Sequence, residues 1–403
     1  MDVGFQICKV KNDLPVILLT CSLNFFWRFL KSCQPFVHFP KIRQLSYSVY
    51  IRFVLFLAIG FTISGCQTDA AQNSGAFFRL EGQTMGTTYH VAYSDSLKRN
   101  FQNDIDQLLI DVNLDVSTYI DTSYISKFNR AEDEIFYLNI REKNAEPDPV
   151  HFRKNYETAY EIFMKSNGFF DPTIMPLVNY WGFGYTEKKA VEEVDSIRVD
   201  SLLQFVGMDK ITKRSAKDGS VYLVKSAPGI QLDFSALAKG YGVDVVCELL
   251  EQNGIENFMV EIGGEVRAKG KNQRNDWWTV GINTPDINAK TSDVFSKVIL
   301  QNRALATSGN YRNYYNVNGN IYAHTINPKT GFPEKSHLLS ASVFAADCMT
   351  ADAYATACMA LGLEKAFELV SRSEDLDGFF IFSEPDGSLM YMHTKGMEDI
   401  LVE

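Results

Sequence analysis

Two oxygen-bearing side chains, four residues apart, give this sequence its most specific chemical signal. They are Asp352 and Thr356, in the stretch MTADAYATACMAL. Its small residues and its lack of Gly and Pro predict a helix over Met349–Leu361, packed closely on at least one side. The two oxygens then share a helical face and could form part of a Mg²⁺ site. Two plainer roles stay open: Asp352 could complement the helix dipole, and Thr356 could bond back to the preceding turn.

A second candidate is the aromatic run GFFDPTIMPLVNYWGFGY over Gly168–Tyr185. Its glycines and prolines predict a rigid, irregular segment, and its rings could stack on the flat ring of a ligand. The alternative is an aromatic corner of the protein core, and the run by itself does not decide between the two.

A third candidate is the junction around Asp233 and Lys239. Ile230–Asp233 is predicted to end a strand, with Ser235 or Asp233 capping a helix that runs to Leu250. A helix N-terminus presents unbonded N–H groups, so this junction suits a ligand phosphate. Many α/β junctions share the pattern, and alone it is a weak signal.

The elements that must position these residues alternate irregularly between helix and strand. Further helices are predicted over Phe101–Val116 and Asn155–Ser166, and Ala306–Arg312 is predicted to be a polar turn. The predicted strands are Thr84–Val91, Phe258–Ile262, Glu265–Lys269, Trp278–Ile282 and Leu339–Ala345. Several of them are separated only by short turns. We therefore predict an α+β fold with mixed or antiparallel sheets, as one catalytic domain of two lobes over residues 76–403.

Composition and charge narrow the class further. The chain has 403 residues, 46% hydrophobic and 22% charged, enough for a substantial core. Residues 1–66 carry a net charge of +5, which leaves −15 for the remainder. That acidic body should repel nucleic acid, so no nucleic-acid partner is predicted. The seven cysteines include no CxxC pair, and Cys247, Cys348 and Cys358 are predicted to be core thiols.

The amino-terminal segment has the order of an export signal. Basic residues precede an apolar run, Phe53–Ile63, which is followed by Ser64-Gly65-Cys66. FTISGC resembles a bacterial lipobox, so Cys66 is the predicted lipid anchor of an exported, periplasm-facing bacterial lipoprotein. Residues 1–45 are then a non-native extension, 46–66 the signal peptide and 67–75 a tether. An uncleaved helix or a buried Cys66 is the alternative.

The chain resembles the ApbE family, the FAD:protein FMN transferases, along essentially the whole predicted mature region. The matching runs are QTMGTTY, STYIDTSYISKFN, FFDPTIMPLVNYWGFG, LDFSALAKGYGVD, VEIGGEVRAKG, ATSGNYRNYY, AHTINPKTGFP and TADAYATACMALG. No single run carries the resemblance, but their order does. The lipobox agrees with it, since many members of the family are exported lipoproteins.

The resemblance implies a set of site residues. The FAD-contacting positions are Met85, Tyr119, Phe169, Phe170, Asp171, Asp233, Lys239 and Ile326. The Mg²⁺ ligands are the side chains of Asp352 and Thr356 and the backbone carbonyl of Ala236. His324 matches the histidine proposed to activate the incoming hydroxyl, although a structural turn histidine is the alternative. The family usually has Asp where this chain has Asn327, so Asn327 is left out of the site.

The implied reaction is attack by a Ser or Thr hydroxyl of an acceptor protein on the flavin-side phosphorus of FAD, with release of AMP. The expected partners are FAD, Mg²⁺, and an acceptor with a Ser/Thr flavinylation motif, such as a redox subunit of a membrane complex. Two other functions stay open: an FAD pyrophosphatase in which water attacks, and a non-catalytic flavin-binding lipoprotein. The sequence contains no convincing acceptor motif of its own.

Overall fold

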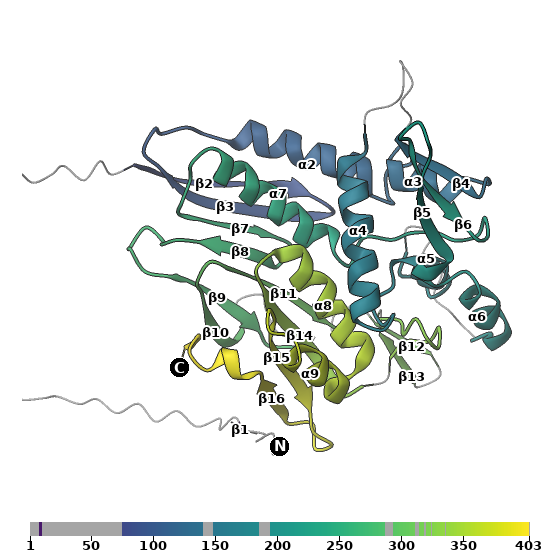
Figure 1. The fold of residues 1–403 in the computed structure, drawn as a ribbon. Helices are drawn as coiled ribbons and strands as arrows, with labels where there is room; N and C mark the ends of the chain where they lie inside the picture. The colour runs from purple at the N-terminus through teal and green to yellow at the C-terminus, as the bar shows by residue number, and fades with distance from the viewer. Residues whose placement is uncertain are drawn as a thin grey trace, which may run out of the picture. The chain divides into compact units, whose positions relative to one another are not determined.

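A nine-stranded antiparallel sheet lies at the centre of the protein (Figure 1). Its order is β1-β16-β15-β14-β11-β8-β7-β3-β2. The bounds are β1 Cys8–Lys9, β2 Ala76–Thr84, β3 Thr87–Asp95, β7 Phe258–Ile262, β8 Glu265–Lys269, β11 Arg303–Gly309, β14 Leu338–Ala345, β15 Asp377–Ser383 and β16 Leu389–His393.

The structure is a computed structural model. It describes residues 8–9, 75–139, 148–184, 194–286, 293–310, 314–317, 320–323, 325–334 and 336–402. The described residues from Gly75 onward belong to one compact unit. The predicted signal peptide, Cys66, the tether as far as residue 74, and His324 lie outside the described residues.

Three smaller sheets complete the strands. One contains β17 (Leu401–Val402), β10 (Val294–Leu300) and β9 (Trp278–Asn283), in that order. A second contains β4 (Ile135–Asn139), β6 (Val221–Lys225) and β5 (Ile211–Ser215), and a two-stranded hairpin contains β12 (Tyr314–Val317) and β13 (Asn320–Ala323). All strand pairings among the described residues are antiparallel, which confirms the predicted α+β class.

Helices cover one face of the large sheet, and the three-stranded sheet of β9, β10 and β17 covers the other (Figure 1). The covering helices are α2 (Gln102–Val116), α7 (Ala238–Gln252), α8 (Cys348–Leu361) and α9 (Leu363–Ser371), with α4 (Val150–Lys165) packed on α2 and α8. Alternation along β7 sends Phe258, Val260 and Ile262 toward α7, and Met259 toward the small sheet. The remaining helices are α3 (Tyr124–Arg130), α5 (Met175–Tyr180), α6 (Ser196–Leu203) and the short 3₁₀ turns η1 (Pro172–Ile174), η2 (Met208–Lys210) and η3 (Lys395–Met397).

The tight turn between β7 and β8 shows why this sheet needs glycine. Ile262 pairs directly with Glu265, so only Gly263 and Gly264 remain for the turn. Their φ values are +61° and +106°, a region that side-chain-bearing residues rarely adopt. The turn places Glu265 at the very start of β8, where the site described below is built.

Helix α8 confirms the predicted central helix. It runs from Cys348 to Leu361, with Asp347 as its N-cap accepting from the N–H of Thr350. Its small residues Ala351, Ala353, Ala355 and Ala357 have no exposed surface, because α8 contacts β11, β14, α4, α7 and α9 at once. Close packing on several sides therefore explains the alanine-rich sequence.

The segment Ile230–Asp233 is not a strand, contrary to the prediction. Ile230 and Leu232 are fully buried in the core, as an apolar strand would be. However, the side chain of Asn129 satisfies the backbone of Leu232, donating to its carbonyl at 2.8 Å and accepting from its N–H at 2.7 Å. A side-chain amide thus replaces the neighbouring strand, which local sequence does not reveal.

Two other local predictions are wrong. Helix α7 has Leu237 as its N-cap without a side-chain bond, because Asp233 bonds the N–H and the hydroxyl of Ser235 instead. Residues 306–309 continue strand β11 and do not turn, since they pair with β14 as far as Gly309. The polar residues of that strand are explained by the cavity that they line.

The aromatic run divides between the two predicted roles. Trp181 is 1% exposed and donates from its indole N–H to the carbonyl of Gly331, in a core cluster that includes Leu177 and Val199. The first part of the run, together with Phe183, faces a cavity. Two turns of helix, η1 and α5, make the segment more regular than predicted.

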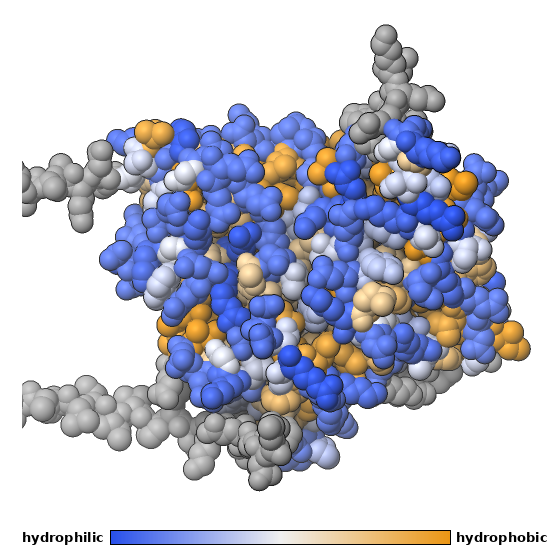
Figure 2. Space-filling view, in the orientation of Figure 1, coloured by the Kyte–Doolittle hydropathy of each residue, from blue (hydrophilic) through white to orange (hydrophobic). Residues whose placement is uncertain are grey.

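The described surface carries few large apolar areas on the side shown in Figure 2. Hydrophilic side chains predominate there, and hydrophobic ones are scattered in small groups. Among the described residues, no helix has the length and apolar character needed to span a membrane.

Candidate active site

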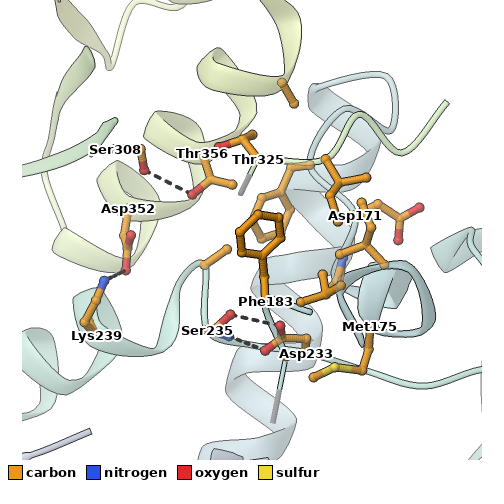
Figure 3. Close-up of a pocket in the computed structure, with 18 of the residues that line it drawn as sticks. Asp171, Met175, Phe183, Asp233, Ser235, Lys239, Ser308, Thr325, Asp352 and Thr356 are labelled. Carbon is orange, nitrogen blue, oxygen red and sulfur yellow. Dashed lines mark hydrogen bonds and ion pairs between the residues drawn. The ribbon is translucent and has the colours of Figure 1, made fainter. Parts of the chain in front are cut away.

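A cavity of about 450 Å³ opens among α7, α8, β11 and the aromatic run. Several of its residues are drawn in Figure 3. Its lining comprises Thr118, Tyr119, Phe169, Phe170, Asp171, Pro172, Ile174, Met175, Val178, Phe183, Gly184, Asp233, Ser235, Ala236, Lys239, Gly263, Glu265, Thr307, Ser308, Gly309, Thr325, Ile326, Asp352, Thr356 and Ala360. Segments more than 200 residues apart in the sequence therefore meet in one hollow.

Asp352 is the most deeply buried acid of the cavity wall, with 2% of its surface exposed. One of its carboxylate oxygens accepts from the backbone N–H of Gly240 at 3.1 Å, which ties α8 to the start of α7. Burial raises the pKa of Asp352, although Lys239 and the Gly240 N–H oppose that effect. The protein alone therefore disfavours the charge on Asp352, and a bound cation would favour it.

Lys239 lies between two buried carboxylates. Its ammonium donates to Glu265 at 2.8 Å and lies 3.9 Å from the nearer oxygen of Asp352. Figure 3 shows Lys239 and Asp352 pointing toward each other from α7 and α8. Burial lowers the pKa of Lys239, but Asp352 and Glu265 outweigh it and raise that pKa above its ordinary value. The ammonium is thus paired within the wall.

Glu265 is 4% exposed, and burial raises its pKa while Lys239 opposes the rise. Its second carboxylate oxygen is buried and has no hydrogen-bond partner among the described residues. Glu265, Asp352 and Lys239 together carry one excess negative charge when all three are ionised. A cation is the ligand that such a wall favours.

Thr356 is held by a neighbouring strand. Alternation along β11 turns Ala304, Ala306 and Ser308 toward the helices, and the Ser308 hydroxyl lies 3.2 Å from that of Thr356. The hydrogen bond appears as a dashed line in Figure 3. The Thr356 hydroxyl thus contacts a side chain of the neighbouring strand. This contact is different from the alternative role considered above, a bond back to the preceding turn of its own helix.

Away from Lys239 and Asp352 the cavity carries aromatic and apolar side chains together with Asp171 and Asp233 (Figure 3). Phe169, Phe170 and Phe183 line it, with Met175 and Ile174 from the turns that follow. Tyr119 lies at the edge of the cavity with 73% of its surface exposed. A flat ring system would find stacking partners on this side and polar partners on the other.

Two further carboxylates of the cavity lining, those of Asp171 and Asp233, accept hydrogen bonds from residues two positions further along the chain. Asp171 accepts from the N–H and the hydroxyl of Thr173, at 2.9 and 2.6 Å, and so caps η1. Burial raises its pKa to about 6, with Thr173 and Lys329 opposing the rise. Burial also raises the pKa of Asp233, against its bonds to Ser235. Both acids shape the cavity through backbone contacts.

The cavity brings together the predicted site residues that the structure describes, with one exception. Met85 does not line it; its side chain lies in the β2–β3 turn beside Gly242 of α7, where its φ is +49°. His324 falls outside the described residues, directly before cavity-lining Thr325. Asn327 is buried and its amide donates to Glu334, while its oxygen accepts from the N–H of Lys329, so it stabilises the turn.

Glu265, Ser308 and Phe183 are site residues that sequence reasoning did not single out. All three belong to runs that were noted for other reasons: the glycine turn, the supposed polar turn and the aromatic run. A signal for Glu265 did exist, because it is an acid at the first position after a Gly-Gly turn in a strand with apolar neighbours. The ion pair between Glu265 and Lys239 depends on the packing of α7 on β8, and the distance between the two residues in the sequence does not predict it.

The residues present suit a divalent metal ion. An acid, a hydroxyl and an excess negative charge meet in one wall, and this is the hard-oxygen chemistry that Mg²⁺ prefers. Among the described residues, no group of three or more His, Cys, Asp and Glu side chains is arranged to hold a metal ion, so such an ion would need backbone, water or substrate oxygens as well. Fold and cavity together define an α+β protein whose cavity joins aromatic side chains, suited to a flat ring, with acidic side chains, suited to a cation.

The chain belongs to the ApbE family. The sequence profile of that family matches residues 85–380, which is most of the chain.

Named relatives and a solved structure agree with this. The FAD:protein FMN transferase of Haemophilus influenzae is 36% identical over 325 residues, covering 79% of this chain and 89% of the relative. That of Vibrio cholerae is 34% identical over 340 residues, covering 83% and 94%. The structure titled flavin transferase ApbE from Vibrio cholerae superimposes with a TM-score of 0.69 at 31% identity, over 81% of this chain and 99% of the other.

Proposed function

We propose that this protein transfers FMN from FAD to a Ser or Thr hydroxyl of an acceptor protein and releases AMP. The observation that carries the proposal is the single cavity in which an aromatic side faces a polar side of Asp352, Thr356 and Lys239. FAD has the same division into a flat ring and a charged diphosphate. The names of the relatives support the same activity.

In this reaction the acceptor hydroxyl oxygen forms a bond to the flavin-side phosphorus, and the bond from that phosphorus to the AMP oxygen breaks. The aromatic side of the cavity would hold the isoalloxazine, with Tyr119 at its edge and Phe170 and Phe183 in the wall. Transfer of this kind depends mainly on positioning and on neutralising charge. The products are FMN joined to the acceptor through a phosphoester, and free AMP.

Mg²⁺ is part of the proposal. Asp352, Thr356 and the backbone carbonyl of Ala236, all in the cavity lining, would hold it. When bound, it would neutralise the diphosphate oxygens and the charge that develops on them. The residues of the chain then have the task of keeping Asp352 ionised and Thr356 oriented, which Gly240 and Ser308 support by hydrogen bonds.

His324 is the proposed base that takes the proton of the acceptor hydroxyl. A hydroxyl is a poor nucleophile near neutral pH, and a positioned base typically contributes about 10²–10⁴-fold. The neighbouring Thr325 and Ile326 both line the cavity, which supports the assignment.

The proposed setting is the periplasmic face of a bacterial membrane. Cys66 would carry the lipid anchor, and the acceptor would be a protein of the same compartment, such as a redox subunit with a Ser/Thr flavinylation motif.

The test is incubation of the full chain with FAD and Mg²⁺, with and without an acceptor that carries a flavinylation-type Ser/Thr motif. We expect covalent, fluorescent labelling of the acceptor and matching AMP release. AMP release without acceptor labelling would point to a pyrophosphatase. Tight FAD binding without any AMP would point to a flavin-binding lipoprotein, and either result would overturn the transferase.

A further inference from the structure

Glu265 is a buried acid of the cavity wall that the proposed chemistry does not use. It begins β8, is 4% exposed, and accepts from the Lys239 ammonium at 2.8 Å with one oxygen. Its other oxygen is buried without a partner among the described residues. An unpaired carboxylate oxygen in such a place is costly, so its retention calls for a reason.

The geometry around Lys239 supplies that reason. Its ammonium lies 3.9 Å from Asp352, close enough to attract but longer than the 2.8 Å contact with Glu265. An ammonium beside one buried carboxylate would close onto it, since paired burial is far less costly than separate burial. Without Glu265, the only buried acid within reach of Lys239 among these described residues would be Asp352.

A direct Lys239–Asp352 pair would compete with a metal ion for the same carboxylate. Both cations need the negative charge of Asp352, and a second positive charge beside the ion adds repulsion. Holding Lys239 on Glu265 leaves the N–H of Gly240 as the one hydrogen-bond donor to Asp352 among the residues that the structure describes.

We propose that Glu265 is a positioning residue that draws Lys239 away from Asp352 and so keeps the Asp352 carboxylate available to a divalent cation. This inference rests on the proposed function, because it takes Asp352 as a metal ligand. It assigns to the Glu265–Lys239 pair a role in metal affinity, distinct from any contact of Lys239 with FAD.

The same helix–strand interface offers a matched control. Alternate residues of β8 face α7 and pair with it: Glu265 with Lys239 at 2.8 Å, Arg267 with Asp244 at 3.1 Å, and Lys269 with Glu251 at 3.3 Å. Glu251 also lies 3.8 Å from Arg267. Glu251→Gln therefore makes the same chemical change as Glu265→Gln, in the same interface, away from the cavity.

The test is titration of the full chain with Mn²⁺ alone, following the free ion by electron paramagnetic resonance. We expect Glu265→Gln to bind Mn²⁺ about 10–100-fold more weakly than wild type, as with other residues that orient metal ligands. Glu251→Gln should bind as wild type does. Thermal unfolding of each variant checks that the fold is kept.

A double-mutant cycle separates this role from a simple charge effect. With Lys239→Gln in place there is no ammonium to hold, so adding Glu265→Gln should change Mn²⁺ affinity by less than about twofold. The comparison of Lys239→Gln with the double variant can be made even if the single Glu265→Gln variant fails to fold. The double variant has no buried ammonium left without its Glu265 partner, so it should fold.

Three results would overturn the inference. Unchanged affinity in a folded Glu265→Gln variant would remove its basis, and an equal loss in the Lys239→Gln background would show that Glu265 acts by its own charge. An equal loss in Glu251→Gln would show a general effect of the interface. If wild type itself shows no Mn²⁺ binding that depends on Asp352, the metal site of the proposed function fails as well.

Discussion

At the scale of single residues, Asp352 combines deep burial with a pKa raised by that burial. Such a carboxylate is an unfavourable charge in the metal-free protein and a favourable one beside a cation. We propose a metal ligand at Asp352, whereas Asp347 caps α8 by accepting from the N–H of Thr350. The contrast leads to the first prediction.

Asp352→Asn should lower FMN transfer by more than about 100-fold, since a metal ligand supplies several kcal/mol of charge stabilisation. The asparagine oxygen can still accept from Gly240, and a buried charge is removed, so the melting temperature without metal should not fall. FMN transfer rates check the expected loss of activity, and thermal unfolding checks the expected melting temperature.

The control is Asp347→Asn on the same helix, where an asparagine can still accept from the N–H of Thr350 and transfer should be unchanged. Wild-type rates in Asp352→Asn would contradict the role assigned to its carboxylate.

Asp171 leads to a prediction about pH. Burial raises its pKa from 3.8 to about 6, so between these values the folded protein binds the proton more tightly than the unfolded chain. The free energy of unfolding should therefore fall as pH rises through this window, by about 3 kcal/mol at most, and level off above it. Asp171→Asn keeps the acceptor for Thr173 and should lose this part of the slope.

The measurement is denaturant unfolding from pH 4 to 8. Asp195→Asn serves as the control, because Asp195 also caps a helix through Arg198 but is exposed. An Asp171→Asn variant with the full wild-type slope would show that its burial has no such consequence.

At the scale of elements, the site depends on the close crossing of α7 and α8. A Cβ on Gly240 would lie 2.4 Å from the carbonyl oxygen of Cys348 and 2.8 Å from the Cα of Met349. These are backbone atoms of α8, so a change of side-chain rotamer cannot relieve the clash. The N–H of the same glycine bonds Asp352, so the crossing and the acid are positioned together.

Gly240→Ala should therefore destabilise the protein by about 1–3 kcal/mol or more and should lower transfer, because it displaces α8. Gly242→Ala, two residues along, would meet the side-chain ends of Met85 and Ile262, at 3.0 and 3.1 Å, and of Leu109 at 3.6 Å. Alanine also favours helix over glycine by about 1 kcal/mol, so this variant should stay active.

Urea unfolding and transfer rates of the two variants test whether the site depends on the close crossing of α7 and α8. Equal behaviour of Gly240→Ala and Gly242→Ala would mean that the close crossing does not matter for the site.

The elements also show how far local sequence can predict this site. The helix with Asp352 and Thr356 follows from a period of four and a run of small residues, and the Gly263-Gly264 turn from its composition. Ile230–Asp233 was misassigned because Asn129, about 100 residues earlier, takes the place of a strand. Ser308 was missed because its polarity fits a turn as well as a strand that lines a cavity.

The resemblance to ApbE, and not periodicity, supplied Tyr119, Asp171 and Ile326. Each is an ordinary residue locally, and becomes part of a site only because the chain returns to one cavity. Pairings such as Lys239 with Glu265 depend on which strand α7 packs against, which is a property of the tertiary structure.

At the scale of the whole molecule, attachment is the remaining proposal. The acidic body of residues 67–403 offers no general attraction to anionic lipids, so membrane binding would depend on lipidated Cys66. Cys66→Ser should move the protein from the membrane fraction to the soluble fraction with its transfer activity intact. Cell fractionation and an activity assay check this, and unchanged retention in the membrane would contradict lipid anchoring.

The most direct test of the central claim is anomalous diffraction from crystals soaked with FAD and Mn²⁺. We expect one strong manganese peak in the cavity, within bonding distance of the Asp352 carboxylate, the Thr356 hydroxyl and the Ala236 carbonyl, and next to the FAD diphosphate. A peak elsewhere, or bound FAD without any peak between those oxygens and the diphosphate, would contradict it.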